Sequence, residues 1–380
     1  MNVAVLTEGA SDSRVALVPE SVPRIVKAGA AVTVQHDAGN RAGFDDSAYR
    51  ESGATIASTP QEALANADIT VKVTRPTDEE LDLLRPGSVL VALLAPLGDP
   101  QYVQGLASRR ITALSMDAIP RITRAQSMDV LSSQSNIAGY KAVLLAAAAL
   151  PKFFPMLTTA AGTIRPAKVL VLGAGVAGLQ AIATARRLGA VVSAYDTRAV
   201  VKEQVQSLGA TFLEIDLGAD GEGTGGYAKE LSAEQIDQQR RFMVEHIGAS
   251  DVVITTALVP GIRAPLLITE EAVAAMKPGS VIVDLAAEAG GNCALTVPGE
   301  TTVAHGVTII GQFNLAGTLP YHASQLYSRN VSALLQLLIK DGQLNVDLND
   351  EIIKGAMLTH DGEIVHQPTL GALQKTGVAS

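Results

Sequence analysis

Three glycines placed directly after a short apolar run constrain this chain more than any other feature. Gly173, Gly175 and Gly178 form a G-x-G-x-x-G pattern between a predicted strand, 167–172, and a predicted helix, 176–188. The first glycine permits a tight turn, the second lets a pyrophosphate approach the backbone, and the third allows close packing of helix on strand. Free N–H groups and the positive end of the helix dipole favour phosphates there. The pattern predicts a Rossmann-type unit that binds a dinucleotide.

An acidic residue stands at the end of the next predicted strand, Val191–Tyr195. Asp196 follows the last glycine by 18 residues, where the carboxylate of a Rossmann unit accepts both hydroxyls of an adenosine ribose. A 2′-phosphate would meet an anion there, so Asp196 favours NAD(H) over NADP(H), although Arg198 would soften the repulsion. The alternative is a Rossmann unit that binds no nucleotide.

Short β-branched runs alternate with helical stretches along most of the chain, which predicts an α/β fold. Strands expected before residue 120 are Val3–Leu6, Ala31–Gln35, Ile69–Val73, Ser88–Leu93 and Ile111–Ser115. After residue 190 they are Val191–Tyr195, Asp251–Thr255, Ser280–Asp284 and Val307–Ile310. Right-handed crossovers make each half a parallel, doubly wound sheet. We expect two Rossmann-like domains with a nucleotide cleft between them.

The character of the sequence changes after Pro120, where a polar segment leads into a helix of small residues. We place the domain boundary there, with residues 133–318 as the NAD(H)-binding domain. An apolar stripe from Leu326 to Leu338 at helical spacing predicts a long helix. This helix and the segments around it, residues 319–380, are expected to complete the N-terminal domain, residues 1–132.

Composition excludes several classes of protein. The 380 residues carry a net charge of −9, which offers no basic field for nucleic acid. A single cysteine, Cys293, excludes a disulfide framework and agrees with a reducing compartment such as the cytoplasm. The six histidines are scattered, so no metal site is expected. No signal peptide is recognisable, and the apolar run Ala142–Leu150 is too short to span a membrane.

Twelve residues beside the predicted boundary carry an unusual density of polar groups. Arg121, Arg124, Gln126, Asp129 and Ser132 all lie in this segment. Such groups can hold a nicotinamide carboxamide by hydrogen bonds, with Arg121 and Asp129 as a charge-assisted pair. The alternative is a capped, solvated start of a helix with surface ion pairs.

Two further segments follow buried strands at the sheet edge where doubly wound folds bind ligands. One runs from Asp284 to Asn292, and the other from Thr255 to Gly261, with Leu258 placed to cover an adenine or nicotinamide ring. Ordinary turn chemistry explains both segments equally well. A third segment, residues 218–226, is rich in glycine and is expected to be a mobile loop or a linker.

Longer motifs resemble those of a known family. They are Pro120-Arg121-Ile122-Thr123-Arg124-Ala125-Gln126-Ser127-Met128-Asp129, Met156-Leu157-Thr158-Thr159-Ala160-Ala161-Gly162-Thr163 and Gly225-Gly226-Tyr227-Ala228-Lys229-Glu230. Together, over nearly the whole length, the chain resembles the NAD(H)-binding component, domain I, of proton-translocating nicotinamide nucleotide transhydrogenase. The resemblance implies direct hydride transfer, of the Si-Re type, between NAD(H) on this chain and NADP(H) on a partner subunit.

The same resemblance implies the surroundings in which the chain works. It implies a homodimer, an NADP(H)-binding partner domain and membrane-spanning partner subunits that couple hydride exchange to proton translocation. The chain itself would have no membrane span, would be cytoplasmic and peripheral at the cytoplasmic face of the membrane, and would be active only with its partner.

The resemblance also assigns residues to the nucleotide. Arg121, Gln126, Asp129 and Ser132 are implied to orient the nicotinamide and its ribose, and Tyr227 to close over the bound nucleotide. Further nucleotide contacts are implied for Ile122, Thr123, Arg124, Ser127, Met128, Gly173, Gly175, Val176, Gly178, Asp196, Thr197, Arg198, Gly226, Gln239 and Leu258.

Alanine dehydrogenase, a relative within this resemblance, provides the alternative function. Arg14 and Lys72 lie where that relative holds pyruvate, but the histidine that it uses as acid/base is missing from the stretch 93–96, which reads Leu-Leu-Ala-Pro. Oxidation of an amine needs such a group, whereas hydride exchange between two nicotinamides moves no proton at the reacting carbons. The absence favours transhydrogenase over an alanine dehydrogenase-like enzyme. A non-catalytic NAD sensor is the third hypothesis.

Overall fold

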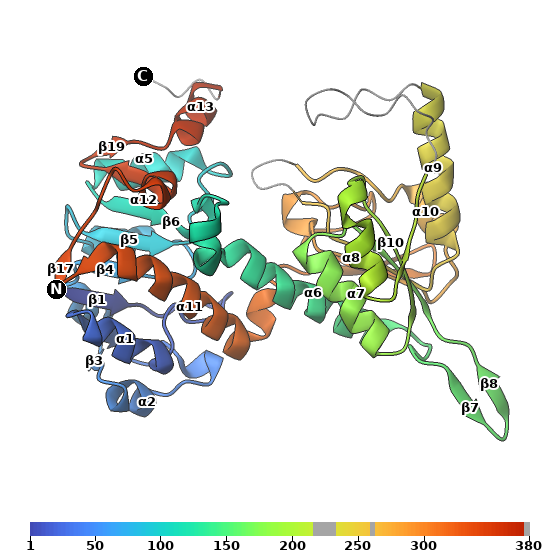
Figure 1. Cartoon of the computed structure of the whole chain (residues 1–380), viewed down its shortest axis with the longest axis horizontal. Helices are drawn as coiled ribbons and strands as arrows, with labels where there is room; N and C mark the ends of the chain where they lie inside the picture. The colour runs from blue at the N-terminus through green and yellow to red at the C-terminus, as the bar shows by residue number, and fades with distance from the viewer. Residues whose placement is uncertain (216–232, 259–262, 376–380) are drawn as a thin grey trace. The chain divides into compact units, whose positions relative to one another are not determined.

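The computed structural model describes residues 1–215, 233–258 and 263–375. The chain divides into two compact units: unit 1 is Met1–Gln134 with Ala316–Ser380, and unit 2 is Ser135–Leu315. Each unit is built on its own mainly parallel sheet with helices on both faces (Figure 1). The predicted α/β class with two parallel-sheet domains is therefore confirmed.

Unit 1 contains the first six strands and the C-terminal elements. Its strands are β1 (Asn2–Val5), β2 (Ala31–Gln35), β3 (Thr55–Ala57), β4 (Ile69–Val71), β5 (Val89–Ala92), β6 (Thr112–Ser115), β16 (Ile339–Lys340), β17 (Gln343–Leu344), β18 (Met357–His360) and β19 (Glu363–Ile364). Its helices are α1 (Val22–Lys27), α2 (Asp46–Glu51), α3 (Pro60–Leu64), α4 (Asp78–Leu83), α5 (Pro100–Ser108), α11 (Pro320–Leu338), α12 (Glu351–Ala356) and α13 (Gln367–Lys375). Helix α6 (Val130–Ala149) begins in unit 1 and continues into unit 2.

The sheet of unit 1 has the strand order β19-β18-β6-β5-β4-β1-β2-β3. Alternate residues of its central strands enter different cores: Val3 and Val5 pack with α1 and α11, whereas Ala4 packs with α3, α4 and α5. Burial on both faces explains why these strands are continuous apolar runs. Strand β18 joins antiparallel to β6, so the C-terminal segment extends the N-terminal sheet.

Unit 2 holds the glycine pattern. Its strands are β7 (Leu157–Thr159), β8 (Gly162–Ile164), β9 (Lys168–Leu172), β10 (Val191–Tyr195), β11 (Thr211–Phe212), β12 (Val252–Thr255), β13 (Val281–Asp284), β14 (Thr301–Ala304) and β15 (Val307–Ile310). Its remaining helices are α7 (Val176–Arg187), α8 (Lys202–Ser207), α9 (Ala233–Gly248) and α10 (Glu270–Ala274). Strands β9 to β15 form one sheet in the order β11-β10-β9-β12-β13-β15-β14, and β7 and β8 pair with each other in a separate sheet.

Each sheet has a switch point, where the chain stops adding strands on one side and continues on the other. In unit 1 it lies between β1 and β4, and in unit 2 between β9 and β12. Ligands of doubly wound folds bind beyond the carboxyl ends of the strands at such points. The glycine pattern follows β9 directly, so it lies at the switch point of unit 2.

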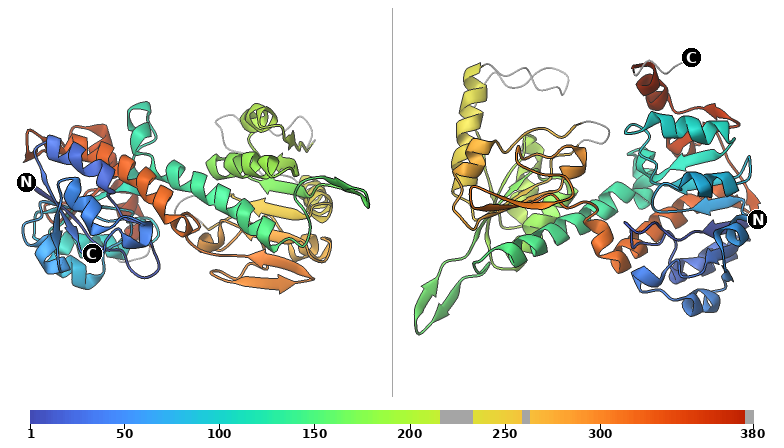
Figure 2. Two further views of the ribbon diagram at one scale, coloured as in Figure 1. Left: turned by 90° about the horizontal axis from the view of Figure 1, so that it is seen from below. Right: turned by 180° about the vertical axis from the view of Figure 1, so that it is seen from behind.

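The antiparallel pair β7 and β8 was not predicted from the sequence. It extends away from the sheet of unit 2 as a separate hairpin (Figure 2), and all six of its strand residues are exposed. Without a buried face, the hairpin has no apolar alternation by which a strand is recognised. Among the described residues, no helix combines the length and apolar character that crossing a membrane requires.

Candidate functional site

The glycine turn joins β9 to α7 with almost no free space around two of its glycines. Gly173 has a φ of +95°, and a Cβ there would lie 2.6 Å from Oγ1 of Thr256. That hydroxyl donates a 3.0 Å hydrogen bond to the carbonyl oxygen of Gly173. At Gly178, a Cβ would lie 1.9 Å from the same carbonyl oxygen. Close packing of β9, α7 and the residues after β12 therefore requires glycine at 173 and 178.

Gly175 differs from its two neighbours because open space surrounds its α-carbon. A Cβ there would meet a single atom within 4 Å, Nη2 of Arg198 at 3.9 Å. Gly175 is also the N-cap of α7 and supplies no side-chain acceptor to the first N–H groups of that helix. Unpaired helix N–H groups beside open backbone form a donor set for phosphate. The residues present thus fit a dinucleotide diphosphate, and Val176 follows at the first position of the helix.

Asp196 follows β10 and contacts the glycine turn. Its Oδ2 accepts hydrogen bonds from the backbone N of Ala174 (2.7 Å) and Nη2 of Arg198 (2.9 Å). Its Oδ1 accepts from the backbone N and from Nε of Arg198, at 2.9 and 3.0 Å. Burial opposes ionisation of Asp196, but these hydrogen bonds outweigh it and lower the pKa of the carboxyl. The carboxylate is therefore ionised and anchored at the end of the strand, next to Thr197.

Two other residues assigned to the nucleotide lie on neighbouring elements of unit 2. Nε2 of Gln239, on α9, donates a 3.2 Å hydrogen bond to Oη of Tyr195 at the end of β10. Leu258 lies three residues beyond β12 and is 51% exposed, so its side chain is accessible to a ligand. Gly226 and Tyr227, with the glycine-rich segment 218–226, lie outside the described residues.

The segment from Asp284 to Asn292 has a structural role. The buried carboxylate of Asp284 accepts hydrogen bonds from four groups of the following loop, and Asn292 Oδ1 accepts from Thr255 Oγ1 at 2.6 Å. The amide nitrogen of Asn292 donates to the carbonyl oxygens of Ala257 and Pro265, both at 2.8 Å. Of the two interpretations that the sequence left open, the structure supports turn chemistry here.

The polar segment 121–132 belongs to unit 1. Its six residues Thr123–Met128 form a 3-10 turn, and Asp129 accepts hydrogen bonds from the backbone N and Oγ of Ser132 at 2.9 and 2.7 Å. Arg121 is exposed, and within the described chain no ion pair joins it to Asp129, so the predicted charge-assisted pair is absent; the hydrogen-bond partner of Asp129 is Ser132, in the first turn of α6. The capped helix start that the sequence left as an alternative is therefore present.

Side chains of this segment divide into buried and exposed sets. Met128 is 5% exposed and packs in the core of unit 1, with Ile122 against that core, so both have packing partners that the sequence did not reveal. The exposed residues are Arg121, Thr123, Arg124, Gln126 and Ser127. The exposed set leaves polar groups available to a ligand, and its role with the nucleotide stays a prediction.

Arg124 has a specific partner far away in the sequence. Its Nη1 and Nη2 contact Oδ2 and Oδ1 of Asp350 at 2.7 and 3.0 Å. Asp350 also caps α12 by accepting from the backbone N of Ile352 at 2.8 Å. The hydrogen bonds from Arg124 and from this helix start lower the pKa of Asp350 to about 2. Nothing in the local sequence around Arg124 indicates this pairing.

Replacing Asp350 by asparagine is expected to remove a pH-dependent part of the stability. Because the pKa of Asp350 is lowered in the folded protein, its carboxylate stabilises the fold at neutral pH. This contribution is lost as the pH falls from about 4 to about 2. We expect about 1 kcal/mol at pH 7, because the half-exposed guanidinium of Arg124 is screened by water. Urea unfolding at pH 7 and pH 2.5 measures the difference.

Asparagine still caps a helix, so the Asp350→Asn comparison isolates the charge. The control is Asp361→Asn, which removes an exposed carboxylate from the turn after β18 and should leave the unfolding free energy nearly unchanged at both pH values. An equal loss of stability at pH 7 and pH 2.5 in Asp350→Asn would mean that Asp350 does not act through its charge.

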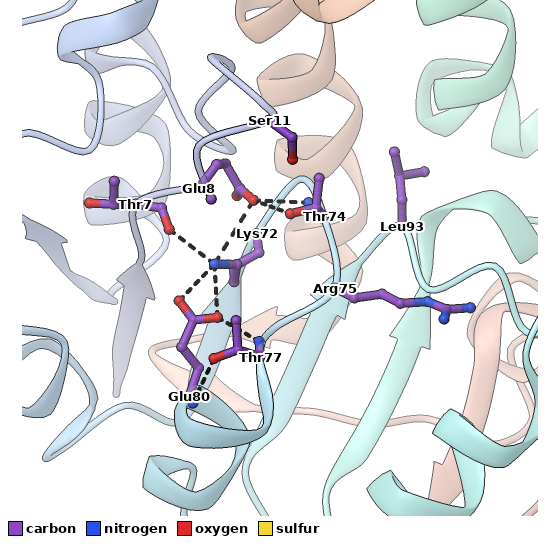
Figure 3. Close-up of a pocket in the computed structure, with 10 residues that line it drawn as sticks. Thr7, Glu8, Ser11, Lys72, Thr74, Arg75, Thr77, Glu80 and Leu93 are labelled. Carbon is purple, nitrogen blue, oxygen red and sulfur yellow. Dashed lines mark hydrogen bonds and ion pairs between the residues drawn. The ribbon is translucent and has the colours of Figure 1, made fainter. Parts of the chain in front are cut away.

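A cavity of about 590 Å³ lies at the switch point of unit 1, and sequence reasoning identified only Lys72 among the charged groups that line it. Lys72 is 2% exposed, and its Nζ donates to the carbonyl oxygen of Thr7 (3.0 Å) and to Glu80 (2.8 Å) (Figure 3). Glu8 lies 3.9 Å from the same Nζ and accepts hydrogen bonds from the backbone N of Val73 and of Thr74. Burial raises the pKa of Glu8, although the charge of Lys72 opposes this shift.

The charges around this cavity are compensated within the chain. Arg75, the second cation at its edge, pairs with Asp99 at 2.9 Å. Arg14 forms an ion pair with Asp12 at 2.5 Å and a hydrogen bond with Gln134 at 2.8 Å. The ten residues that line the cavity include no histidine. Lys72 and Arg14 are thus buried and already paired.

Comparison with known proteins decides the family. Residues 4–138 match the family model described as alanine dehydrogenase/PNT, N-terminal domain, and residues 142–367 match the model of the C-terminal domain. The chain belongs to the alanine dehydrogenase/PNT family. The resemblance stated from the motifs is thereby confirmed.

Within the alanine dehydrogenase/PNT family, the chain is more similar to transhydrogenase subunits than to alanine dehydrogenases. It is 49% identical to the first part of NAD(P) transhydrogenase subunit alpha of Rhodospirillum rubrum, over 95% of this chain and 96% of that one. A solved transhydrogenase structure from Sinorhizobium meliloti matches with a TM-score of 0.85 and 42% identity, covering 97% of this chain and 99% of that one. Alanine dehydrogenase of Bacillus subtilis is 28% identical, over 94% of this chain and 90% of its own length. Family and fold together indicate NAD(H) binding.

Proposed function

We propose that this chain is the NAD(H)-binding subunit of a proton-translocating transhydrogenase. It binds NAD(H) at the switch point of unit 2 and exchanges hydride directly with NADP(H) held by a partner subunit, in the Si-Re type of reaction. The nicotinamide supplies the hydride chemistry. Residues of this chain bind and orient the nucleotide and exclude water from it. Proximity of the two nicotinamides provides most of the acceleration.

The observation that carries this proposal is the glycine turn together with Asp196. Open space at Gly175 and the uncapped start of α7 suit a diphosphate, and the ionised carboxylate of Asp196 suits a ribose without a 2′-phosphate. Relatives named as transhydrogenase subunits alpha are 45–49% identical to this chain, which supports the reaction class. In the same proposal Arg121, Gln126, Asp129 and Ser132 orient the nicotinamide and its ribose, and Tyr227 closes over the nucleotide.

An alanine dehydrogenase-like activity is the second candidate, and the cavity of unit 1 argues against it. Its lysine, Lys72, is neutralised by Glu80 and Glu8, so little positive charge is left for the carboxylate of an oxo acid. No histidine lines the cavity to exchange a proton with an amine. Hydride exchange between two nicotinamides needs neither group.

A homodimer is part of the proposal, and the hairpin β7–β8 supports it. Apolar side chains on and beside it are exposed in one chain: Phe153 (54%), Met156 (63%) and Ile164 (47%). A two-stranded hairpin is marginally stable alone, and a cluster of exposed apolar side chains marks an interface. Light scattering of the purified chain should give the mass of two chains. The assembly would be cytoplasmic and attached to the membrane through partner subunits.

Hydride exchange tests the function directly. The full chain is mixed with NADPH and the acetylpyridine analogue of NAD, with and without an isolated NADP(H)-binding partner domain. We expect exchange above background with the partner and none without it, because each nucleotide needs its own subunit. NADH oxidation by pyruvate and ammonia, measured in parallel, should be absent.

Each other outcome identifies a rival function. Rapid NADH oxidation by pyruvate and ammonia, without exchange, would replace the proposal by an alanine dehydrogenase-like enzyme. Tight NADH binding with neither reaction would leave a non-catalytic sensor. Absence of NADH binding would remove the nucleotide site itself.

A further inference from the structure

The carboxylate expected to bind the adenosine ribose is fully occupied within the chain. An ionised carboxylate offers about four acceptor positions, two on each oxygen. In Asp196 these are filled by the backbone N of Ala174 and by three nitrogens of Arg198, its backbone N, Nε and Nη2. A ribose therefore finds no acceptor position on Asp196 while Arg198 holds this arrangement.

The four hydrogen bonds differ in how easily they can be released. Two come from the backbone and belong to the turn, whereas the other two come from the guanidinium of Arg198, whose side chain is 59% exposed. Rotation of this guanidinium into water breaks two hydrogen bonds, the one from Nε to Oδ1 and the one from Nη2 to Oδ2. One acceptor position is then free on each oxygen of Asp196. Two free acceptors, one on each oxygen, match the two hydroxyls of a ribose.

Arg198 also reaches the place where the diphosphate is expected. Its Nη2 would lie 3.9 Å from a Cβ built on Gly175, which has no other atom within 4 Å of that position. The guanidinium therefore occupies the ribose acceptor and lies at the edge of the open space beside Gly175. Among the described residues, no other charged side chain pairs with Asp196.

We propose that Arg198 is a specificity-determining residue of the nucleotide site, as an exchangeable counter-ion of Asp196 that leaves the carboxylate when NAD(H) binds and limits how strongly a 2′-phosphate is rejected. This inference rests on the proposed function, because it assumes that NAD(H) binds at the glycine turn. A nucleotide with a 2′-phosphate brings negative charge to Asp196, and the displaced guanidinium is the cation positioned to offset it. Without Arg198, the repulsion acts in full, while NAD(H) no longer competes with an ion pair.

Binding constants for NADH and NADPH, measured by calorimetry on the full chain, test the proposal. In Arg198→Ala we expect NADH to bind as tightly as in the wild type or more tightly, and NADPH to bind more weakly. The preference for NADH should rise about tenfold, the effect of losing a charge-assisted contact that is partly exposed to water. Arg198→Lys keeps the charge and should keep a preference near that of the wild type.

The control is Arg187→Ala, which removes an arginine from the C-terminal end of α7, the end away from the glycine turn. It should change neither the NADH nor the NADPH binding constant. Where NADPH binds the wild type too weakly to titrate, the comparison is repeated in an Asp196→Asn background. The repelling carboxylate is then gone. Adding Arg198→Ala in this background should weaken NADPH binding and leave NADH binding unchanged.

Two results would overturn the proposal. One is an unchanged preference in Arg198→Ala, and the other is an equal loss of NADH and NADPH binding, which would make Arg198 a contact common to both nucleotides. Either result requires that the wild type binds NADH. A wild type that fails to bind NADH instead contradicts the proposed function, so the two failures are distinguishable.

Discussion

Replacing Gly178 by alanine is expected to destabilise unit 2 by about 3–5 kcal/mol. The added Cβ would lie 1.9 Å from the carbonyl oxygen of Gly173 and 2.9 Å from its carbonyl carbon, so the backbone of the turn or the start of α7 must move. Both are backbone, and neither can rotate away as the end of a flexible side chain would. Urea unfolding, followed by circular dichroism, measures the loss, and NADH binding should be lost with it.

Gly175→Ala is the matched control, because it makes the same change three residues earlier. Gly175 has φ −77° and ψ −165°, a conformation open to any residue, and a Cβ there contacts only Arg198. We expect its unfolding free energy within about 1 kcal/mol of the wild type. NADH should nevertheless bind at least about tenfold more weakly, since a methyl group stands where a pyrophosphate approaches the backbone. A stable Gly178→Ala would contradict the described packing of the turn.

Replacing Asp284 by alanine is expected to be the second large loss, again about 3–5 kcal/mol. The side chain is buried, and its Oδ2 accepts from the backbone N of Asn292 (2.8 Å), the backbone N of Cys293 (3.1 Å) and Oγ1 of Thr296 (2.7 Å). Its Oδ1 accepts from the backbone N of Ala286 at 3.0 Å. Truncation leaves all four donors without an acceptor in a buried loop. The unfolding free energy measured in urea gives the cost.

Asp284→Asn separates the hydrogen bonds from the packing of the side chain. The amide keeps one acceptor oxygen at nearly the same volume, so it should recover part of the stability lost in Asp284→Ala. A loss below about 1 kcal/mol in Asp284→Ala would mean that water replaces the carboxylate and that the loop is not held from within. Reduced NADH binding in a still stable variant would instead indicate a direct role of this loop at the nucleotide site.

Secondary-structure elements that depend on a short stretch of sequence were predicted well. Strands Ala31–Gln35, Val191–Tyr195 and Val307–Ile310 have the predicted bounds, because short runs rich in β-branched residues are recognisable without any knowledge of their neighbours. The glycine turn was predicted because the spacing of its three glycines is a local pattern, although the side chain that crowds Gly173, Thr256, lies 83 residues away. The hairpin β7–β8 was missed because none of its residues is buried.

The partners of charged residues could not be predicted in the same way. Arg124 is predicted to contact the nucleotide, and nothing in the sequence indicates that it also pairs with Asp350, which is 226 residues away. Lys72 was compared with a pyruvate-binding lysine, yet Glu80 and Glu8 neutralise it. Each of these pairs joins different elements, so no spacing in the sequence reports it.

The sequence by itself determined the α/β class, the position of the glycine turn and the acidic residue at the end of the next strand. These features depend on backbone hydrogen bonding, burial period and glycine sterics, which act over a few residues. Only the tertiary structure decided that the backbone N of Ala174 bonds Asp196, that Arg124 pairs with Asp350, and that Glu8 lies 3.9 Å from Nζ of Lys72. Whether a polar side chain is free or already bonded depends on what folding brings within about 3 Å of it, and that distance is set by the packing of elements far apart in the chain.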